Sequence, residues 1–599
     1  MAEKILRKRE DIPEEYKWKL EDMFASDEQW EQETRELLSS VKDVEKYKGK
    51  LGESAENLYL YFKKLDELVY HADRVYVYAN QRLHQDTTVA KYQGYSSKAD
   101  AVLVSLQSAI AFADPEILTI AEQTLEAFYN EKPELLHYKR KIDEIRRMKE
   151  HTLSETEEAL LAQAGELAAA PGNIYSMFNN ADIKFPYITD VEGNRIQITH
   201  GNYIDMLNST DRSMRKQAFF GVYDTYKKWG NTVTATYLAQ LKRDSFYAKV
   251  RKYSSTREMY LSRGNIPESV YDNLIKTVNS HLPALHRYMA VRKERLGVDK
   301  LRMYDLFVSV VDDVEKKYTY QQAKELVATA LAPMGQEYVN TLKEGMEGGW
   351  IDVYENENKR SGAYSWGAYG THPYVLLNHQ DNINSVFTLA HEMGHAMHTY
   401  YSNSAQEITY ADYLIFVAEV ASTCNEALLM HYLFENTKDQ AEKEYLIFHY
   451  LDKFRTTLFR QAQFAEFEHE AHRLLENGQA VTMESLNKLY FDINAKYYGP
   501  GLFYDQAIEY EWMRIPHFYK PYYVYQYSTG FSAAIAFSKM ILEEGAPAVE
   551  RYVNNFLKGG SSKDPIDLLA AAGVDMSTSK PIDDALKVFE EYLKKLEEG

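Results

Sequence analysis

Two histidines and a glutamate lie close together in the stretch HEMGH, residues 391–395. His391 and His395 are four positions apart, so on a helix both imidazoles face the same side, one turn apart. Glu392 then stands where its carboxylate can reach a water held beside the histidines. Hydrolysis of a peptide bond by a metal needs such ligands, an open position and a neighbouring base. The spacing therefore indicates a metal-dependent hydrolytic site; the alternative is a helix that carries these residues by chance.

The surrounding segment, residues 385–401, has apolar residues at helical spacing. Ser385, Asn384 or Asp381 is expected to cap its start. A glycine inside a helix costs up to about 1 kcal/mol relative to alanine. Gly394 therefore makes sense if another backbone passes close to this helix.

A third metal ligand must come from elsewhere in the chain. His398 lies on the same face as His391, but ligands two turns apart on one helix would span about 10 Å, too far for one ion. His398 is therefore expected to pack near the site rather than to bind the metal. The pattern HExxHxxGxxH also fails, because it requires glycine at 398 and histidine at 401, where this chain has His398 and Tyr401.

The segment 411–434 is strongly helical and supplies the remaining candidates. Glu419 is surrounded by apolar residues, and a buried carboxylate needs a partner, either a metal ion or an arginine. Glu426 lies seven positions on, on the same face, where it can accept an N–H from a ligating imidazole. Asp412 could do the same from the other side. For each of these residues the alternative is a solvated or salt-bridged carboxylate.

Helices are expected to position these residues. Helical periodicity dominates residues 28–165, 210–295 and 319–345, and again from 405 to the end. The pair Pro171-Gly172 predicts that one helix stops at Ala170.

Two stretches break the helical pattern. Residues 184–199 are typical of a β-hairpin, and we place a domain boundary there, between an N-terminal helical region, 1–200, and a catalytic region, 201–599. Residues 348–379, directly before HEMGH, predict short strands with glycine-rich turns.

The composition excludes several classes of function. The chain has 599 residues, enough for two to four lobes by the usual size of domains. Its formal net charge of −20 disfavours nucleic acid and anionic membranes as partners. The N-terminus has no apolar signal region, and no window predicts a membrane span. Cys424 is the only cysteine, which excludes an internal disulfide and suits the cytoplasm.

These motifs together resemble peptidase family M3, the zinc metallopeptidases that include thimet oligopeptidase and neurolysin, and most closely its bacterial oligoendopeptidase F branch. The resemblance rests on HEMGHAMH, on FVAEVAS followed by Glu426, on residues 350–365 and on RIPHFYKPYYVYQYSTG, residues 514–530. It runs through most of residues 200–590. It implies that His391, His395 and Glu419 bind one Zn²⁺ and that Glu392 is the general base.

The resemblance also gives a role to the tyrosine-rich segment. In the family, a histidine and tyrosines of this region polarise the scissile carbonyl, and the matching residues here are His517, Tyr522 and Tyr525. The spacing from His517 to the tyrosines is shorter than in the mammalian members. A neutral phenol can donate a hydrogen bond to a developing oxyanion. From the sequence alone, an aromatic core run is the simpler interpretation of these tyrosines.

The resemblance implies a mainly α fold: a zincin-type catalytic region with a small β-sheet, inside a two-lobed helical structure that encloses a deep channel. Residues 362–370 would be an edge strand and loop beside the cleft, or else an ordinary surface loop. The implied function is a cytoplasmic zinc endopeptidase that hydrolyses short unstructured peptides through a metal-activated water. A helical metallocarboxypeptidase or aminopeptidase and a non-catalytic peptide-binding protein remain as alternatives.

Overall fold

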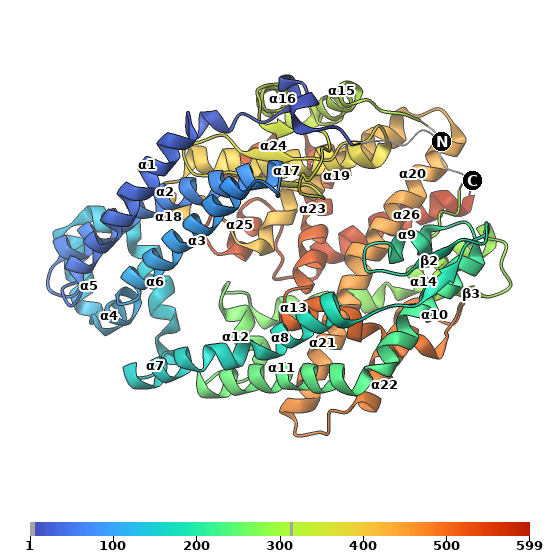
Figure 1. Ribbon diagram of the computed structural model, residues 1–599, viewed down its shortest axis with the longest axis horizontal. Helices are drawn as coiled ribbons and strands as arrows, with labels where there is room; N and C mark the ends of the chain where they lie inside the picture. The colour runs from blue at the N-terminus through green and yellow to red at the C-terminus, as the bar shows by residue number, and fades with distance from the viewer. Residues whose placement is uncertain (1–5, 312–315, 599) are drawn as a thin grey trace. The chain divides into compact units, whose positions relative to one another are not determined.

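The computed structural model describes residues 6–311 and 316–598, and it is built mainly from helices (Figure 1). The chain divides into two compact units, and each unit combines three separate chain segments. Unit 1 contains residues 1–155, 316–429 and 537–573, and unit 2 contains 156–315, 430–536 and 574–599. The mainly α fold class is confirmed, whereas the division into 1–200 and 201–599 stays a prediction.

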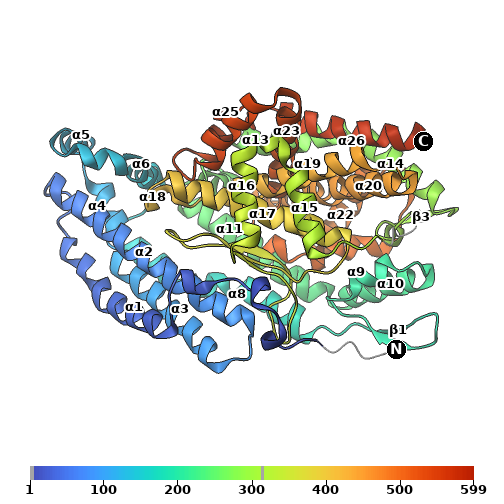
Figure 2. The ribbon, with the colours of Figure 1, turned by 90° about the horizontal axis from the view of Figure 1, so that it is seen from above.

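Unit 1 contains the helix that bears HEMGH. Its helices are α1 (Asp27–Ser40), α2 (Ala55–Gln85), α3 (Ala90–Ile110), α4 (Ala113–Thr119), α5 (Glu122–Glu131), α6 (Lys139–Arg147), α15 (Tyr320–Ala330), α16 (Gln336–Glu347), α17 (Ile383–Ala405), α18 (Ile408–Ala411), α24 (Ala546–Arg551) and α25 (Pro565–Ala571). Helix α19 (Ile415–Asn436) begins in this unit and passes into unit 2 after Leu429. In Figures 1 and 2 the helices α2 and α3 run side by side, and α15 and α16 contact α17.

A three-stranded sheet precedes α17, as the sequence predicts. Strand β6 (Tyr374–Leu376) lies in the middle, parallel to β4 (Ile351–Asp352) and antiparallel to β5 (Tyr364–Trp366). Only β6 pairs with β5 among the described residues, so β5 is an edge strand. The chain leaves β6 and enters α17 seven residues later, which fixes the direction of that helix.

Buried charges hold the sheet together. The Lys359 ammonium forms an ion pair of 2.7 Å with Asp352 and donates to the carbonyls of Tyr354 and Leu377. Arg9 pairs with the other carboxylate oxygen of Asp352. Burial alone would raise the pKa of Asp352, but the two cations outweigh it and the pKa lies below its ordinary value. Because each buried charge has a partner, the loop that contains Lys359 is tied to the end of β6, just before α17.

Unit 2 is also helical. Its helices are α8 (Gly165–Met177), α9 (Tyr203–Asn208), α10 (Arg212–Lys228), α11 (Gly230–Val250), α12 (Thr256–Ser262), α13 (Glu268–Ser280), α14 (Leu282–Arg295), α20 (Gln440–Lys453), α21 (Arg460–Glu476), α22 (Met483–Tyr498) and α26 (Lys580–Glu598). Helix α7 (Glu155–Gln163) starts at the unit boundary, and α23 (Tyr525–Glu544) passes into unit 1 after Ala536. Strand β3 (Leu301–Arg302) pairs in parallel with β7 (Leu502–Phe503).

The hairpin is confirmed and the predicted helix stop is wrong. Strands β1 (Tyr187–Thr189) and β2 (Arg195–Gln197) pair antiparallel, and Asp190 accepts backbone N–H bonds inside their turn. Helix α8, however, runs straight through Pro171 to Met177, and the helical run is interrupted at Ala164 instead. Proline removes one backbone donor, which leaves the carbonyl of Leu167 without its helical partner. Leu167 is 79% exposed, so this turn of α8 lies at the surface.

One stretch is apolar enough for a membrane helix by length and mean hydropathy. It covers residues 90–119, with a mean hydropathy of 1.4 over its best window, of which 28% is buried. The stretch comprises two helices, α3 and α4, and Val102, Leu106 and Ala109 belong to the hydrophobic core of unit 1. One helix that passes by length and hydropathy alone is weak evidence for a membrane span.

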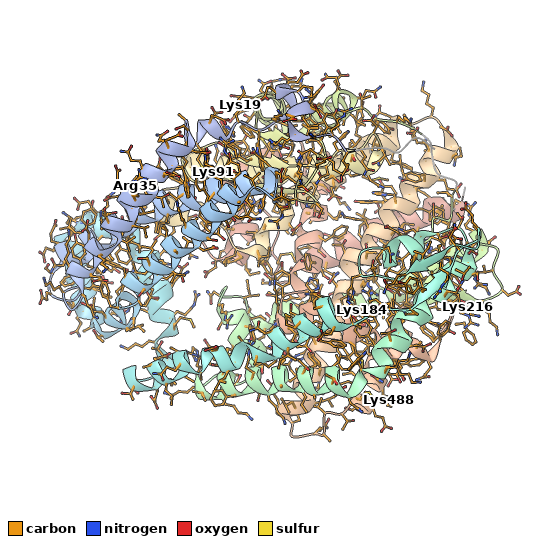
Figure 3. All side chains as sticks on the ribbon, in the orientation of Figure 1. Lys19, Arg35, Lys91, Lys184, Lys216 and Lys488 are labelled. Atoms are coloured by element: carbon orange, nitrogen blue, oxygen red, sulfur yellow. The ribbon has the colours of Figure 1, made fainter. Side chains whose placement is uncertain are left out.

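Acidic side chains form local ion pairs with basic side chains. Figure 3 labels six basic residues, four of them on helices and two, Lys19 and Lys184, in loops. Lys91 pairs with Asp27 in unit 1, and Lys488 pairs with Asp492 along α22. Such exposed pairs contribute little stability each. The paired acidic groups do reduce the positive surface potential that binding of an anionic polymer such as nucleic acid would require.

Candidate metal centre

Helix α17 places His391, Glu392 and His395 on the same element, as predicted. It is capped by Asn382, whose side-chain oxygen accepts the N–H of Ser385 at 2.9 Å. The predicted caps were therefore wrong by one or more positions. The true cap is the residue with extended backbone, φ −142° and ψ 168°, which lets its side chain turn back onto the first turn.

Glu419 of α19 meets the two histidines of α17. Its Oε2 atom lies 3.5 Å from Nε2 of His391 and 3.8 Å from Nε2 of His395. The three donor atoms all lie within 4.8 Å of one another, and each side chain is partly accessible. The structure thus brings together the three residues that the sequence singled out as metal ligands.

The remaining imidazole nitrogens are held by the protein. Nδ1 of His391 hydrogen-bonds to Oε1 of Glu426 at 2.5 Å. His395 is hydrogen-bonded to the backbone carbonyl of Ala418. These contacts fix both ring orientations and leave the two Nε2 atoms directed at Glu419. The Asp412 carboxylate instead accepts the N–H of its neighbour Tyr413, and its predicted supporting role stays a prediction.

The donor set fits a zinc ion. Ligands of a tetrahedral Zn²⁺, at bond lengths of about 2.0–2.2 Å, lie about 3.3–3.6 Å apart. The 3.5 Å separation between Glu419 and His391 lies within that range, the 3.8 Å separation between Glu419 and His395 lies slightly above it, and all three donor atoms lie within 4.8 Å of one another. Glu392 and Glu426 add two more carboxylates around the same point, and a cation there would offset their mutual repulsion.

Glu392 is the carboxylate beside the ligands that is not itself in the ligand set. It is 7% exposed, and its side chain accepts a backbone N–H bond from Ser365 of strand β5. Burial raises the pKa of its carboxyl to about 7, partly opposed by His391. The edge strand therefore orients Glu392, a contact between residues far apart in the sequence.

Gly394 allows α17 and α19 to touch. A Cβ atom at this position would lie 2.4 Å from Cα of Ser422 and 2.8 Å from the carbonyl oxygen of Ala421. Asn425 of α19 also donates to the carbonyl of Ala390 at 3.2 Å. The close backbone expected from the sequence is confirmed, and it sets the distance at which Glu419 faces the histidines.

We therefore expect Gly394→Ala to impair the metal site. The added methyl group must push α19 away by a fraction of an ångström or more, and misplacement by about 1 Å can cost about 10²-fold in rate. Zinc content and kcat measured on the purified variant should both fall. Gly94→Ala in α3 is the matched control, because a Cβ there meets nothing within 4 Å. Full zinc content and rate in Gly394→Ala would contradict this account of the helix crossing.

His398 packs behind the site, as the sequence argument expected. Its ring stacks on Tyr413 with 3.8 Å between centroids and an interplanar angle of 10°, and it also contacts Phe556. It is 1% exposed, and burial lowers its pKa to about 3. A neutral, enclosed imidazole here supports the helix rather than the ligand set.

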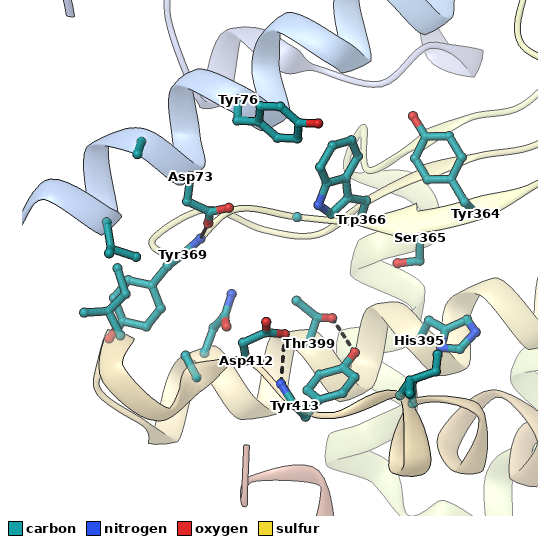
Figure 4. Close-up of a pocket in the computed structure, with 18 of the residues that line it drawn as sticks. Asp73, Tyr76, Tyr364, Ser365, Trp366, Tyr369, His395, Thr399, Asp412 and Tyr413 are labelled. Carbon is teal, nitrogen blue, oxygen red and sulfur yellow. Dashed lines mark hydrogen bonds between the residues drawn. The ribbon is translucent and has the colours of Figure 1, made fainter. Parts of the chain in front are cut away.

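A cavity of about 770 Å³ in unit 1 includes the metal centre. Strand β5 lines it with Tyr364, Ser365 and Trp366, across from the helix that carries His395 (Figure 4). Helices α2 and α3 contribute mainly apolar side chains to its lining. The predicted edge strand beside the cleft is thus present, paired with β6 on one side.

The three predicted carbonyl-polarising residues belong to unit 2. Tyr525 begins helix α23 and is 2% exposed, and burial raises its pKa above the ordinary value. Tyr522 is also buried, and its hydroxyl lies 3.3 Å from Nδ1 of His469. His517 is half-buried, and burial lowers its pKa. Their roles stay predictions.

The sequence reasoning did not single out Tyr523 and Tyr527. Both are half-buried, and their hydroxyls are hydrogen-bonded at 3.3 Å. The Tyr523 ring lies parallel to His517, with 6.1 Å between centroids and an angle of 9°. Tyr523 lies two residues before α23 begins at Tyr525, so helix periodicity gave no signal for this pair. Ser365 and Ala418, which act through backbone atoms, left no signal either.

Comparisons with known proteins agree with this geometry. Residues 205–588 match Peptidase family M3, and residues 116–185 match the family described as Oligopeptidase F. Oligopeptidase PepF of Bacillus subtilis is 50% identical over 590 residues, which cover 98% of this chain and 88% of that protein. Group B oligopeptidase PepB of Streptococcus agalactiae is 41% identical over 98% of both chains.

Solved structures show the same fold. The crystal structure of oligoendopeptidase-F from Enterococcus faecium is 39% identical, with a TM-score of 0.76 over 96% of this chain and 99% of that one. A crystal structure from Chlamydophila abortus gives a TM-score of 0.92 at 32% identity, over 99% of this chain and 100% of that one.

Proposed function

We propose that this chain, a metalloendopeptidase that belongs to peptidase family M3, uses one zinc ion to hydrolyse internal bonds of short oligopeptides. The family resemblance stated from the sequence motifs is confirmed by the matches. The observation that carries the proposal is the convergence of His391, His395 and Glu419 inside a cavity that also contains Glu392. Membership of a peptidase family would not by itself identify the metal ion or the roles of these residues.

His391, His395 and Glu419 would hold the ion through Nε2, Nε2 and a carboxylate oxygen. When bound, zinc supplies a Lewis acid that polarises a water and the scissile carbonyl. Glu426 keeps the His391 ring in place through its Nδ1 hydrogen. The Ala418 carbonyl does the same for His395.

Glu392 moves the proton. Its carboxylate takes a proton from the attacking water and later delivers it to the leaving amine nitrogen. The N–H of Ser365 keeps the carboxylate pointing into the cavity. In family M3 a base at this position serves the same purpose, and here it is the one carboxylate of HEMGH.

Tyr525, with His517 and Tyr522, would stabilise the negative charge that develops on the carbonyl oxygen. The Tyr525 phenol is protonated at neutral pH, as an ordinary phenol is, and burial raises its pKa further. A neutral phenol donates a hydrogen bond without gaining or losing a proton. Loss of one such donor typically costs about 10²–10³-fold in kcat.

The substrates would be short, unstructured peptides. The edge strand β5 lines the cavity, and its backbone groups other than the Ser365 N–H and the Trp366 carbonyl would bond a peptide whatever its side chains. The net charge of −20 stands against nucleic acid and anionic membranes as partners. The single cysteine, Cys424, is buried and suits a cytoplasmic location.

Hydrolysis of an internally quenched peptide with both ends blocked tests this function. The zinc-loaded enzyme should cut the peptide at an internal bond, identified by mass spectrometry, and a chelator should abolish cleavage until Zn²⁺ is restored. An aminopeptidase or carboxypeptidase needs a free terminus and would leave the blocked peptide whole. A preparation that binds peptide without cleaving it would place the chain among non-catalytic binding proteins.

A further inference from the structure

Tyr522 has a backbone conformation that its side chain disfavours. Its φ is +54°, in the left-handed region, which a bulky residue rarely adopts. It lies three residues before α23, and the turns that follow it set the beginning of that helix. A strained residue persists only where the surrounding structure holds it.

Glu468 of α21 holds this backbone. The side chain is 1% exposed, and its Oε1 atom accepts the N–H of Tyr522 at 2.9 Å. Its Oε2 atom is buried and has no hydrogen-bond partner within residues 6–311 and 316–598. Burial raises the pKa of Glu468 to about 8, so the carboxyl is largely protonated at neutral pH. A buried carboxyl with one oxygen unsatisfied is costly for folding alone, which indicates a role beyond stability.

The Tyr522 ring is enclosed on several sides. Tyr260 stacks on it with 6.1 Å between centroids, and Tyr271 meets it edge-on at 5.6 Å. His472, one turn along α21 from Glu468, lies 5.2 Å away. Tyr271 also packs against Tyr525, with 5.1 Å between centroids. The same aromatic framework therefore contacts both the strained residue and the first residue of α23.

Hydrogen bonds of His472 and Asp244 hold the helix around Glu468 in place. Nδ1 of His472 donates to the backbone carbonyl of Glu468 at 2.9 Å, and its Nε2 atom lies 3.4 Å from Asp244 of α11. Asp244 is fully buried and accepts hydrogen bonds from Gln240 and Tyr260. This network ties α21 to α11, so Glu468 acts from a rigid support.

We propose that Glu468 is a positioning residue: by holding the backbone of Tyr522 it fixes the start of α23 and the place of the Tyr525 phenol. The inference rests on the proposed function, in which Tyr525 donates to the carbonyl of the substrate. Glu468 does not touch the substrate. It acts through the chain that leads from Tyr522 to Tyr525.

The test compares Glu468→Met with Glu468→Gln on an end-blocked peptide. Methionine removes the acceptor at nearly constant volume, whereas glutamine keeps an oxygen for the N–H of Tyr522 and resembles the protonated carboxyl. Glu468→Met should lower kcat by about 10²-fold, with KM and zinc content close to wild type. Glu468→Gln should stay within about threefold of the wild-type kcat. Glu470→Met is the matched control, because Glu470 lies on the same helix and pairs with Arg473 along it.

A double-mutant cycle separates this proposal from the proposed function. If Glu468 acts through Tyr525, Glu468→Met should add little once Tyr525→Phe has removed the hydroxyl. A silent Tyr525→Phe would remove the phenol from the mechanism, whatever Glu468 does. A strong Tyr525→Phe combined with multiplicative effects, or a wild-type kcat in Glu468→Met, would overturn the positioning role.

A shorter side chain covers the case in which methionine prevents folding. Glu468→Asp keeps the carboxyl and withdraws it by one methylene, so its kcat should fall by about tenfold with zinc retained. A purely structural role predicts a different pattern, in which Tm falls and the kcat of the folded, zinc-loaded fraction is unchanged. That pattern in Glu468→Asp would also refute the proposal.

Discussion

Replacing Glu392 by glutamine should lower kcat by about 10²–10⁴-fold, while zinc remains bound in full. Glutamine has nearly the same shape and can still accept the Ser365 N–H, but it cannot take a proton from water. Glu392 lies outside the ligand set of His391, His395 and Glu419, so the ion should lose no donor. The change therefore isolates proton transfer from metal binding.

The measurement pairs kcat for a blocked peptide with zinc per chain by atomic spectroscopy. Glu407→Gln is the matched control, since Glu407 is exposed and precedes the short helix α18 of the same unit. It should leave both quantities unchanged. Retention of full activity in Glu392→Gln would remove the residue from the role of base, and loss of zinc would show that it helps to hold the ion.

Glu419→Ala should abolish stoichiometric zinc binding and with it the activity. Two histidines on one helix turn provide only part of a tetrahedral set, and the third donor comes from α19. Removal of the carboxylate also leaves the cluster with fewer negative charges to attract a cation. Added zinc should restore the chelated wild type but not this variant at the same free-metal concentration.

Glu426→Gln provides a graded comparison. Glutamine weakens the hydrogen bond that orients His391, and loss of such an outer contact typically lowers metal affinity by about 10–100-fold. Competition with a chromogenic chelator should therefore rank the affinities as wild type, Glu426→Gln and Glu419→Ala. If Glu419→Ala bound zinc as tightly as Glu426→Gln, the ligand set would need a different third member.

Local sequence was enough to single out the residues of the candidate metal site. His391 and His395 stand out because their spacing places both on one face of a helix. Glu419 stands out because a carboxylate among apolar residues is costly to bury without a partner. Gly394 even indicated that a second backbone must come close. These residues could be picked out as candidates because the signals are periodic or chemically costly and are therefore visible in one short window.

The same local reasoning misplaced features whose outcome depends on exposure or on backbone angles. The helix cap is Asn382 rather than its neighbours, and α8 continues through Pro171 to Met177. The φ and ψ angles of a single residue decide which residue caps a helix. Several neighbouring residues of suitable type are equally good candidates from the sequence alone.

Only the tertiary structure decided which distant residues complete the site. Ser365 orients Glu392 and Ala418 orients His395 through backbone atoms, which carry no signature of side-chain type. Glu468 reaches Tyr522 across 54 positions of the chain. The sequence by itself indicated the chemistry, because candidate ligands and a candidate base can be recognised from residue type and spacing. The fold decided how that chemistry is held, because packing brings together atoms whose proximity no local pattern encodes.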